Sequence, residues 1–354
     1  MNAGLILLSA ALLLSGLVTV LTLRHAVRLG LIQAPNQRSS HEVPTPGGGG
    51  AGMAVAGVTA SLWIAFQSAQ PLTWLAIAGA AGLLALVGFR DDIAPVSARL
   101  RFLVQAGVCA LLLIAIPPLP PLPLAGDWAI GGTLLLAPLL FIGIWWVNLF
   151  NFMDGVDGLA SAQALFMTAA GAVLIATADP AAPAGHPAWL WNMALVGAIV
   201  GFLPFNWPPA RIFMGDVGST FLAFSLFALA LLSIAAGWMP FATWLILAAV
   251  FVSDATVTLL RRMLAGERWM QAHRSHAYQH LARRWHGIGK RGHRRVTCLV
   301  LAVNVVWLAP LAAASVTWPQ WQWGIAVVAY APLLTAVIRL GAGRPERLAS
   351  QGNS

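Results

Sequence analysis

Long apolar segments recur along the whole chain and are separated by short polar loops. Eleven of them approach or exceed the length that a membrane-spanning helix requires, which is about 17–25 mostly apolar residues. They lie near residues 4–23, 51–69, 72–89, 101–118, 131–150, 160–178, 190–206, 217–236, 240–260, 296–316 and 322–340. This pattern predicts an all-α, polytopic integral membrane protein with about 11 transmembrane helices.

The composition supports this prediction. Hydrophobic residues make up 59% of the chain and charged residues only 9%, whereas a soluble domain carries roughly 25% charged residues. Because no separate soluble domain or repeat is visible, we expect one transmembrane domain over residues 1–340 and a flexible cytoplasmic tail over 341–354. Both cysteines, Cys109 and Cys298, fall within predicted spans, so no disulfide framework is indicated.

The distribution of basic residues predicts the orientation. The first span is followed by Arg24 and Arg28 and has no basic residue before it, which indicates an uncleaved span with a periplasmic N-terminus. The segments predicted to face the cytoplasm are 24–50, 90–100, 151–159, 207–216, 261–295 and 341–354. The net charge of +9 then reflects loops that face anionic membrane lipid, and a nucleic-acid partner is not indicated.

Acidic residues are few, and several share one predicted face. The chain has 11 acidic residues, of which Asp91, Asp92, Asp154, Asp157 and Asp216 lie at cytoplasmic ends of different spans. Carboxylates at the C-terminal end of a helix oppose its dipole, so the Asp91–Asp92 pair in "GFRDD" indicates either a solvated loop start with arginine counter-ions or a bound cation. Their convergence suggests one site.

The segment "NLFNFMDGVDGLAS" follows directly on an apolar run. Asn148 and Asn151 are three residues apart and lie on neighbouring parts of one helix face. Gly155 and Gly158 end the helix, and the "DGVDG" turn can bring backbone N–H groups close to a ligand. An ordinary helix end explains the glycines and aspartates but not the two amides, so we favour a functional interpretation.

Two further cytoplasmic segments carry candidate side chains. In "RIFMGDVGST", Asp216 begins a predicted helix, where it is either a helix cap or part of an anion and metal site. In "HRSHAYQHLARR", His276 and His280 are four residues apart and share a helical face. Arg274 beside them favours anion binding over zinc, whereas Arg283, Arg284 and the later "KRGHRR" are typical of a basic helix on a lipid surface.

The remaining candidates are less specific. His41 lies in "RSSHEVPTPGGGG", a polar, glycine-rich loop that either closes over a substrate or is simply flexible. Asp254 lies inside a predicted span, where an acid is a functional candidate but can equally pair within the helix bundle. A multi-span cation-coupled transporter that uses Asp254 and the cytoplasmic-face acids is therefore an alternative to an enzyme.

Oxygen ligands beside a basic loop suit Mg²⁺ and phosphate chemistry. In this setting "GFRDD", "NLFNFMDGVDGLA", "FMGDVGS" and the histidine-containing last loop resemble, in this order, motifs of the polyprenyl-phosphate N-acetylhexosamine-1-phosphate transferases. This superfamily includes phospho-N-acetylmuramoyl-pentapeptide transferase and the enzymes that start O-antigen synthesis. The resemblance covers residues 30–285. The loops "RSSHEVPTP" and "HRSHAYQHLARR" resemble the O-antigen-initiating branch, although Gly47 replaces the basic residue or methionine expected before the glycines.

The resemblance implies an Mg²⁺-dependent enzyme, with Mn²⁺ as an alternative cation, in a bacterial inner membrane. It would transfer a sugar phosphate from a UDP-N-acetylhexosamine to undecaprenyl phosphate and release UMP on the cytoplasmic side. The implied site residues are Asp216 and Asn151 for the metal, Asp91 and Asp92 with Asp216 for catalysis, Gly155, Asp157, Phe213 and Asn148 for the nucleotide, and Arg274, His276, His280 and His273 for the sugar or phosphate. The roles of Asp154, Asp254 and His41 stay open, as do the sugar and a homodimeric state.

Overall fold

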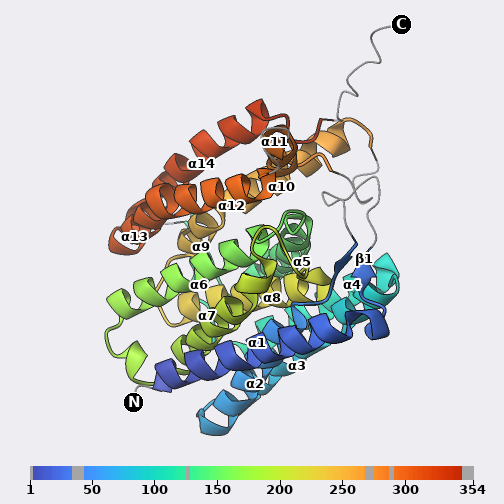
Figure 1. Ribbon diagram of the computed structural model, residues 1–354. Coiled ribbons are helices and arrows are strands. Elements are labelled where there is room, and N and C mark those ends of the chain that lie inside the picture. The colour runs from blue at the N-terminus through green and yellow to red at the C-terminus, as the bar shows by residue number, and fades with distance from the viewer. Residues whose placement is uncertain (1–2, 34–43, 125–127, 268–273, 287–290, 345–354) are drawn as a thin grey trace, which may run out of the picture.

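The computed structural model describes residues 3–33, 44–124, 128–267, 274–286 and 291–344. Long helices lie side by side in one bundle (Figure 1), and β1 and α11 lie toward the same end of it. The helices are α1 (Ala3–Leu29), α2 (Ala51–Gln67), α3 (Pro71–Ile93), α4 (Ala98–Ala115), α5 (Leu136–Phe152), α6 (Leu159–Ala178), α7 (Pro187–Asn206), α8 (Gly215–Ala235), α9 (Phe241–Leu247), α10 (Ala249–Leu264), α11 (Ala277–His286), α12 (Gly292–Val303), α13 (Ala309–Thr317) and α14 (Gln322–Arg339).

The helices confirm an all-α polytopic membrane protein. Among the described residues, nine helical segments are long and apolar enough to cross a membrane, and the bent pair α9 and α10 makes a tenth. The eleventh predicted span corresponds to α2, a shorter apolar helix of 17 residues. Every predicted span therefore coincides with helix. The orientation of the bundle across a membrane stays a prediction.

Helix α8 forms the centre of the bundle. Its most apolar 18-residue window is entirely buried, whereas only 22% of the corresponding window of α1 and 17% of that of α14 are buried. Helices α3 and α5 both pack along α8. Residues at the ends of α3 and α5 contact the first turn of α8, so the packing of these helices forms a cluster at its N-terminus.

A break between α9 and α10 turns the chain by 79°. Backbone carbonyls released by such a break need partners, because apolar surroundings cannot supply them. Side chains of other helices provide them: Gln163 on α6 donates to the Leu247 carbonyl at 2.9 Å, and Tyr330 on α14 donates to the Leu245 carbonyl at 2.8 Å. Asn304 in turn donates to Gln163 at 2.7 Å. The Leu245 and Leu247 carbonyls at the break therefore have hydrogen-bond partners.

Two short antiparallel strand pairs connect helices. Strand β1 (Ile32–Gln33) pairs with β2 (Thr45–Pro46), and β3 (Leu122–Pro123) pairs with β4 (Ala129–Ile130). After β2, the glycines approach the start of α8: the Gly50 N–H donates to the Met214 carbonyl at 2.9 Å. A Cβ on Gly50 would lie 2.2 Å from the Gly218 Cα, so only glycine allows this approach.

The chain after α14 corrects the predicted boundary at residue 340. Ala342 is fully buried, and its carbonyl accepts a hydrogen bond from Arg261 at 2.9 Å. The Gly343 N–H donates to the Ser275 carbonyl at 2.8 Å. The packed region thus extends beyond 340, because these residues join α10 to the segment before α11.

Candidate functional site at the N-terminus of helix α8

Asp92, at the end of α3, caps the N-terminus of α8. Its carboxylate accepts hydrogen bonds from the N–H groups of Asp216 at 2.8 Å and Val217 at 3.2 Å. The first N–H groups of a helix have no partner within it, and a negative charge there is favoured by the helix dipole. Asp216 itself is not the cap that one sequence interpretation allowed, because it lies in the first turn of α8.

Two glycines allow this contact between α3 and α8. A Cβ on Gly88 would lie 2.6 Å from the Asp216 carbonyl oxygen. Gly215 has a φ of +75° and its Cβ would lie 2.4 Å from the Asp92 carboxylate. The glycines of "GFRDD" and "FMGDVGS" are therefore explained by the close approach of the two segments.

Asp91 has different partners from its neighbour. Its carboxylate accepts a hydrogen bond from the Val96 N–H and forms an ion pair with Arg101 on α4. The same guanidinium lies 3.5 Å from Asp216 Oδ2. Arg101 thus joins the two carboxylates. The sequence alone did not single out Arg101, because ten residues separate it from Asp91 and no local pattern relates them.

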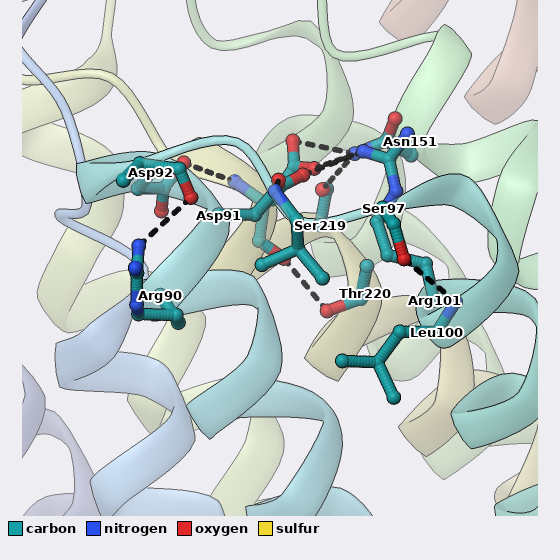
Figure 2. Close-up of polar contacts among 12 residues, drawn as sticks. Arg90, Asp91, Asp92, Ser97, Leu100, Arg101, Asn151, Ser219 and Thr220 are labelled. Carbon is teal, nitrogen blue, oxygen red and sulfur yellow. Dashed lines mark hydrogen bonds and ion pairs between the residues drawn. The ribbon is translucent and has the colours of Figure 1, made fainter.

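Asn151 brings the end of α5 to the same place. Its amide nitrogen donates to Asp216 Oδ1 at 2.8 Å and to Ser219 Oγ at 3.0 Å (Figure 2). Asn148, one turn earlier, donates instead to Gln105 on α4 at 2.8 Å and to the carbonyl of Ile144 in its own helix. The structure therefore brings Asn151 to Asp216, as the metal assignment requires, and directs Asn148 toward α4.

The turn between α5 and α6 lies beside these carboxylates. The partly buried Asp154 has a pKa well above its usual value, because burial disfavours its charged form and Asp216, Asp92 and Asp157 add repulsion. The Gly155 N–H donates to Tyr278 Oη at 3.1 Å. Gly158, with a φ of +71°, donates its N–H to Asn206 Oδ1 at 3.1 Å. The turn is thus held from both ends.

Asp157 ties this turn to two other segments. It accepts a hydrogen bond from the Ala210 N–H at 3.1 Å and lies 3.2 Å from His293 Nδ1 on α12. Thr297, also on α12, donates to its carbonyl at 3.0 Å. Sequence reasoning missed His293, since it lies in the "KRGHRR" segment that was interpreted as lipid-facing. A histidine within that basic run was the available signal.

Asp254 is paired within the bundle. Its carboxylate lies 3.3 Å from His276 Nδ1, and both side chains are buried. His280, in contrast, lies 3.1 Å from Arg283, which also donates to the Arg274 carbonyl. The His280 N–H also donates to the His276 carbonyl at 3.1 Å, which is the helical relation that their spacing predicted, and the two imidazoles contact different side chains. His41 and His273 lie outside the described residues.

The Asp216 environment fits a hard divalent cation. Its oxygen donors are Asp216, Ser219, Asp91 and the Asn151 amide, which would turn to present Oδ1. In the part of the chain that the structure describes, no three His, Cys, Asp or Glu side chains form a ready cage. Mg²⁺ usually takes one or two carboxylates plus substrate phosphates, so this donor set fits a cation held jointly with a substrate. Phe213 is placed nearby by the Pro46 carbonyl, which accepts its N–H at 2.8 Å.

Comparison with known proteins links this arrangement to a family. Residues 74–234 match the family model described as glycosyl transferase family 4. The chain is 28% identical over 277 residues to a probable undecaprenyl-phosphate N-acetylglucosaminyl 1-phosphate transferase of Bacillus subtilis, covering 75% of this chain and 73% of the relative.

Two further relatives extend this similarity. The decaprenyl-phosphate N-acetylglucosaminephosphotransferase of Mycobacterium leprae is 30% identical over 330 residues, which cover 82% of this chain and 78% of the relative. A phospho-N-acetylmuramoyl-pentapeptide-transferase of Symbiobacterium thermophilum is 32% identical over 248 residues, which cover 66% of this chain and 73% of the relative.

Proposed function

Because the chain belongs to glycosyl transferase family 4, we propose that it transfers an N-acetylhexosamine-1-phosphate from a UDP-sugar to a polyprenyl phosphate. One bond forms, between a lipid phosphate oxygen and the sugar-bearing phosphorus. One bond breaks, between that phosphorus and the oxygen bridging to the uridine phosphate, and UMP leaves. The observation that carries the proposal is the Asp216–Asn151 contact beside the Asp91–Arg101 pair.

Asp216 and Asn151 are proposed to hold Mg²⁺, or Mn²⁺ in its place, against the pyrophosphate of the donor. A cation there would neutralise charge that develops on the phosphates. Asp216 lies at the positive end of the α8 dipole, where backbone N–H groups also favour a phosphate. Ser219 carries no charge, and its hydroxyl accepts from the Asn151 amide at 3.0 Å, which keeps the Asn151 side chain beside Asp216.

The Asp91–Asp92 pair divides into two roles in this proposal. Asp91 would orient or deprotonate the lipid phosphate, and the adjacent Arg101 would attract it. Asp92 would position Asp216, since its carboxylate is bound to the first amides of α8. Residues assigned to the nucleotide remain Gly155, Asp157, Phe213 and Asn148, and those assigned to the sugar or phosphate remain Arg274, His276, His280 and His273.

The biological setting follows the same reasoning. We propose undecaprenyl phosphate as acceptor, a cytoplasm-facing site in a bacterial inner membrane, and initiation of O-antigen or another cell-surface polysaccharide. The first loops and the last cytoplasmic loop support the O-antigen branch by resemblance. The transporter alternative is not favoured, because the carboxylate of Asp254 is already bound to His276 and to two backbone amides.

Replacing Asp216 tests the metal assignment. Asp216→Asn should lower Mg²⁺-dependent UMP release by more than about a hundredfold, since even partners of metal ligands contribute about 10–100-fold. Asp179→Asn is the matched control, because Asp179 follows α6 and contacts Trp238, away from α8's N-terminus. Comparable turnover in the two variants would refute the assignment.

A further inference from the structure

Asp254 on α10 organises the start of α11. Its two carboxylate oxygens accept hydrogen bonds from the N–H groups of Ala277 and Tyr278, both at 2.9 Å. Thr258 donates to the same carboxylate at 3.0 Å. Asp254 is only 2% exposed. Its buried carboxylate caps the N-terminus of α11, a helix of 10 residues. This cap fixes where α11 begins and in which direction Tyr278 projects.

Tyr278 connects α11 to the turn that follows α5. Its hydroxyl donates to the carbonyl of Phe152, the last residue of α5, at 3.0 Å. The same oxygen accepts the Gly155 N–H at 3.1 Å. One hydroxyl therefore joins a helix-terminal carbonyl, which lacks a partner within its helix, to the first glycine of the "DGVDG" turn.

The hydroxyl also explains why residue 155 is glycine. A Cβ at this position would lie 2.4 Å from Tyr278 Oη and 2.9 Å from Gln279 Nε2. The backbone of Gly155 is outside the left-handed region. Alanine at 155 is therefore opposed by contact with α11 and not by backbone strain.

The tyrosine keeps its proton under ordinary conditions. Burial raises the pKa of Tyr278 well above 10, and the negative charges of Asp254 and Asp154 raise it further. The hydroxyl therefore stays protonated at neutral pH and can donate to the Phe152 carbonyl.

We propose that Asp254 and Tyr278 are positioning residues for the Asp154–Gly158 turn: Asp254 fixes the start of α11, and the Tyr278 hydroxyl sets the conformation of the turn that receives the nucleotide. The inference rests on the proposed function, because it takes this turn as the uridine site. Neither residue needs to touch the substrate. The prediction is that their loss weakens donor binding and leaves acceptor binding unchanged.

The two tyrosines of the chain provide a matched pair of variants. Tyr278→Phe removes the hydroxyl at the turn, and Tyr330→Phe removes one that donates to the Leu245 carbonyl on α9. We expect Tyr278→Phe to raise the KM for the UDP-sugar roughly tenfold, as the loss of two hydrogen bonds suggests. The KM for polyprenyl phosphate should stay within about twofold, and Tyr330→Phe should leave both constants unchanged.

A coupling measurement shows whether Tyr278 acts through Gly155. Gly155→Ala alone should raise the donor KM, because its methyl group meets the Tyr278 hydroxyl. In the Tyr278→Phe background the same substitution should add less, since the 2.4 Å contact is gone and the remaining 2.9 Å contact is with the flexible end of the Gln279 side chain. Independent, additive effects of the two substitutions would overturn the proposed contact. Asp254→Asn should reproduce the donor-specific effect, since its amide cannot accept both N–H groups.

The outcomes separate this inference from the function it rests on. UMP binding to the purified protein, measured by calorimetry, provides a readout besides turnover and should weaken by about the same factor in Tyr278→Phe. Wild-type protein that neither binds UMP nor releases it from any UDP-sugar would overturn the proposed function and the inference together. Wild-type turnover with equal donor constants in Tyr278→Phe and Tyr330→Phe would overturn the inference alone.

Discussion

Two adjacent carboxylates that look alike in the sequence are expected to respond differently to mutation. Asp92 is bound to two backbone N–H groups at the start of α8, whereas Asp91 is bound to Val96 and to Arg101. Asp92 should therefore contribute mainly to the stability of the fold. Asp91 should contribute mainly to turnover.

The contacts give the size of the difference. A typical hydrogen bond contributes about 0.5–1.5 kcal/mol, so the loss of the two bonds of Asp92 in Asp92→Ala should lower the free energy of unfolding by about 2 kcal/mol. Asp92→Asn keeps one accepting oxygen and should cost about half as much. Asp91→Asn keeps the acceptor for the Val96 N–H and loses the ion pair with Arg101, whose side chain is 42% exposed. An exposed ion pair of this kind contributes less than about 1 kcal/mol to stability.

Thermal unfolding followed by intrinsic fluorescence suits this comparison, because the chain has 16 tryptophans. Measured without added divalent cation, the unfolding midpoint should fall little in Asp91→Asn, more in Asp92→Asn and most in Asp92→Ala. UMP release should show a different order, with Asp91→Asn strongly impaired despite its normal midpoint. If Asp92→Ala unfolds at the wild-type temperature, or if Asp91→Asn is the less stable of the two asparagine variants, the capping argument is wrong.

Three further variants test other parts of the structure. Arg101→Gln should reduce turnover more than tenfold with little change in the unfolding midpoint. Arg99→Gln, which replaces an exposed neighbour on the same helix, should change neither turnover nor the midpoint. Equal turnover in the two variants would contradict the role of Arg101 between Asp91 and Asp216. Gln163→Leu should lower the free energy of unfolding by about 1–3 kcal/mol, because it leaves the Leu247 carbonyl and the Asn304 amide without their partner. An unchanged unfolding midpoint would show that these groups find other hydrogen-bond partners. Asp154→Asn should stabilise the protein at pH 8 more than at pH 5. The raised pKa of Asp154 means that the folded state holds this proton more tightly than the unfolded state does. The stability of the wild-type protein therefore falls as pH rises above the usual carboxyl pKa. A midpoint difference that does not grow with pH, measured in chelator, would contradict this sign.

The apolar pattern predicted the membrane architecture because spans are set by local chain properties, and each of the eleven segments coincides with helix. The break at Leu247 was missed, since an uninterrupted apolar run carries no proline or glycine at that point to mark it. Its stability comes from Gln163 and Tyr330, which lie far away in sequence.

The residues that form the candidate site were easier to predict from the sequence than the contacts between them. The scarcity of acids indicated that Asp91, Asp92 and Asp216 belong together, and Asn151 lies against Asp216 in the structure. The division between Asp91 and Asp92, the role of Arg101 and the Asp157–His293 contact were not predictable. Each depends on the angle at which one helix end meets another, and residue spacing along the chain does not carry that information.

Labelled donor substrate gives the most direct test of the proposed reaction. Membranes or purified protein would be supplied with undecaprenyl phosphate, Mg²⁺ and UDP-N-acetylhexosamine carrying a radioactive phosphorus at the sugar-bearing position. We expect this label to enter the lipid, UMP to be released in equal amount, and the lipid product to have the mass of a polyprenyl pyrophosphate bearing one sugar. Release of labelled UDP with an unlabelled lipid would show transfer of the sugar alone and would contradict the proposed reaction.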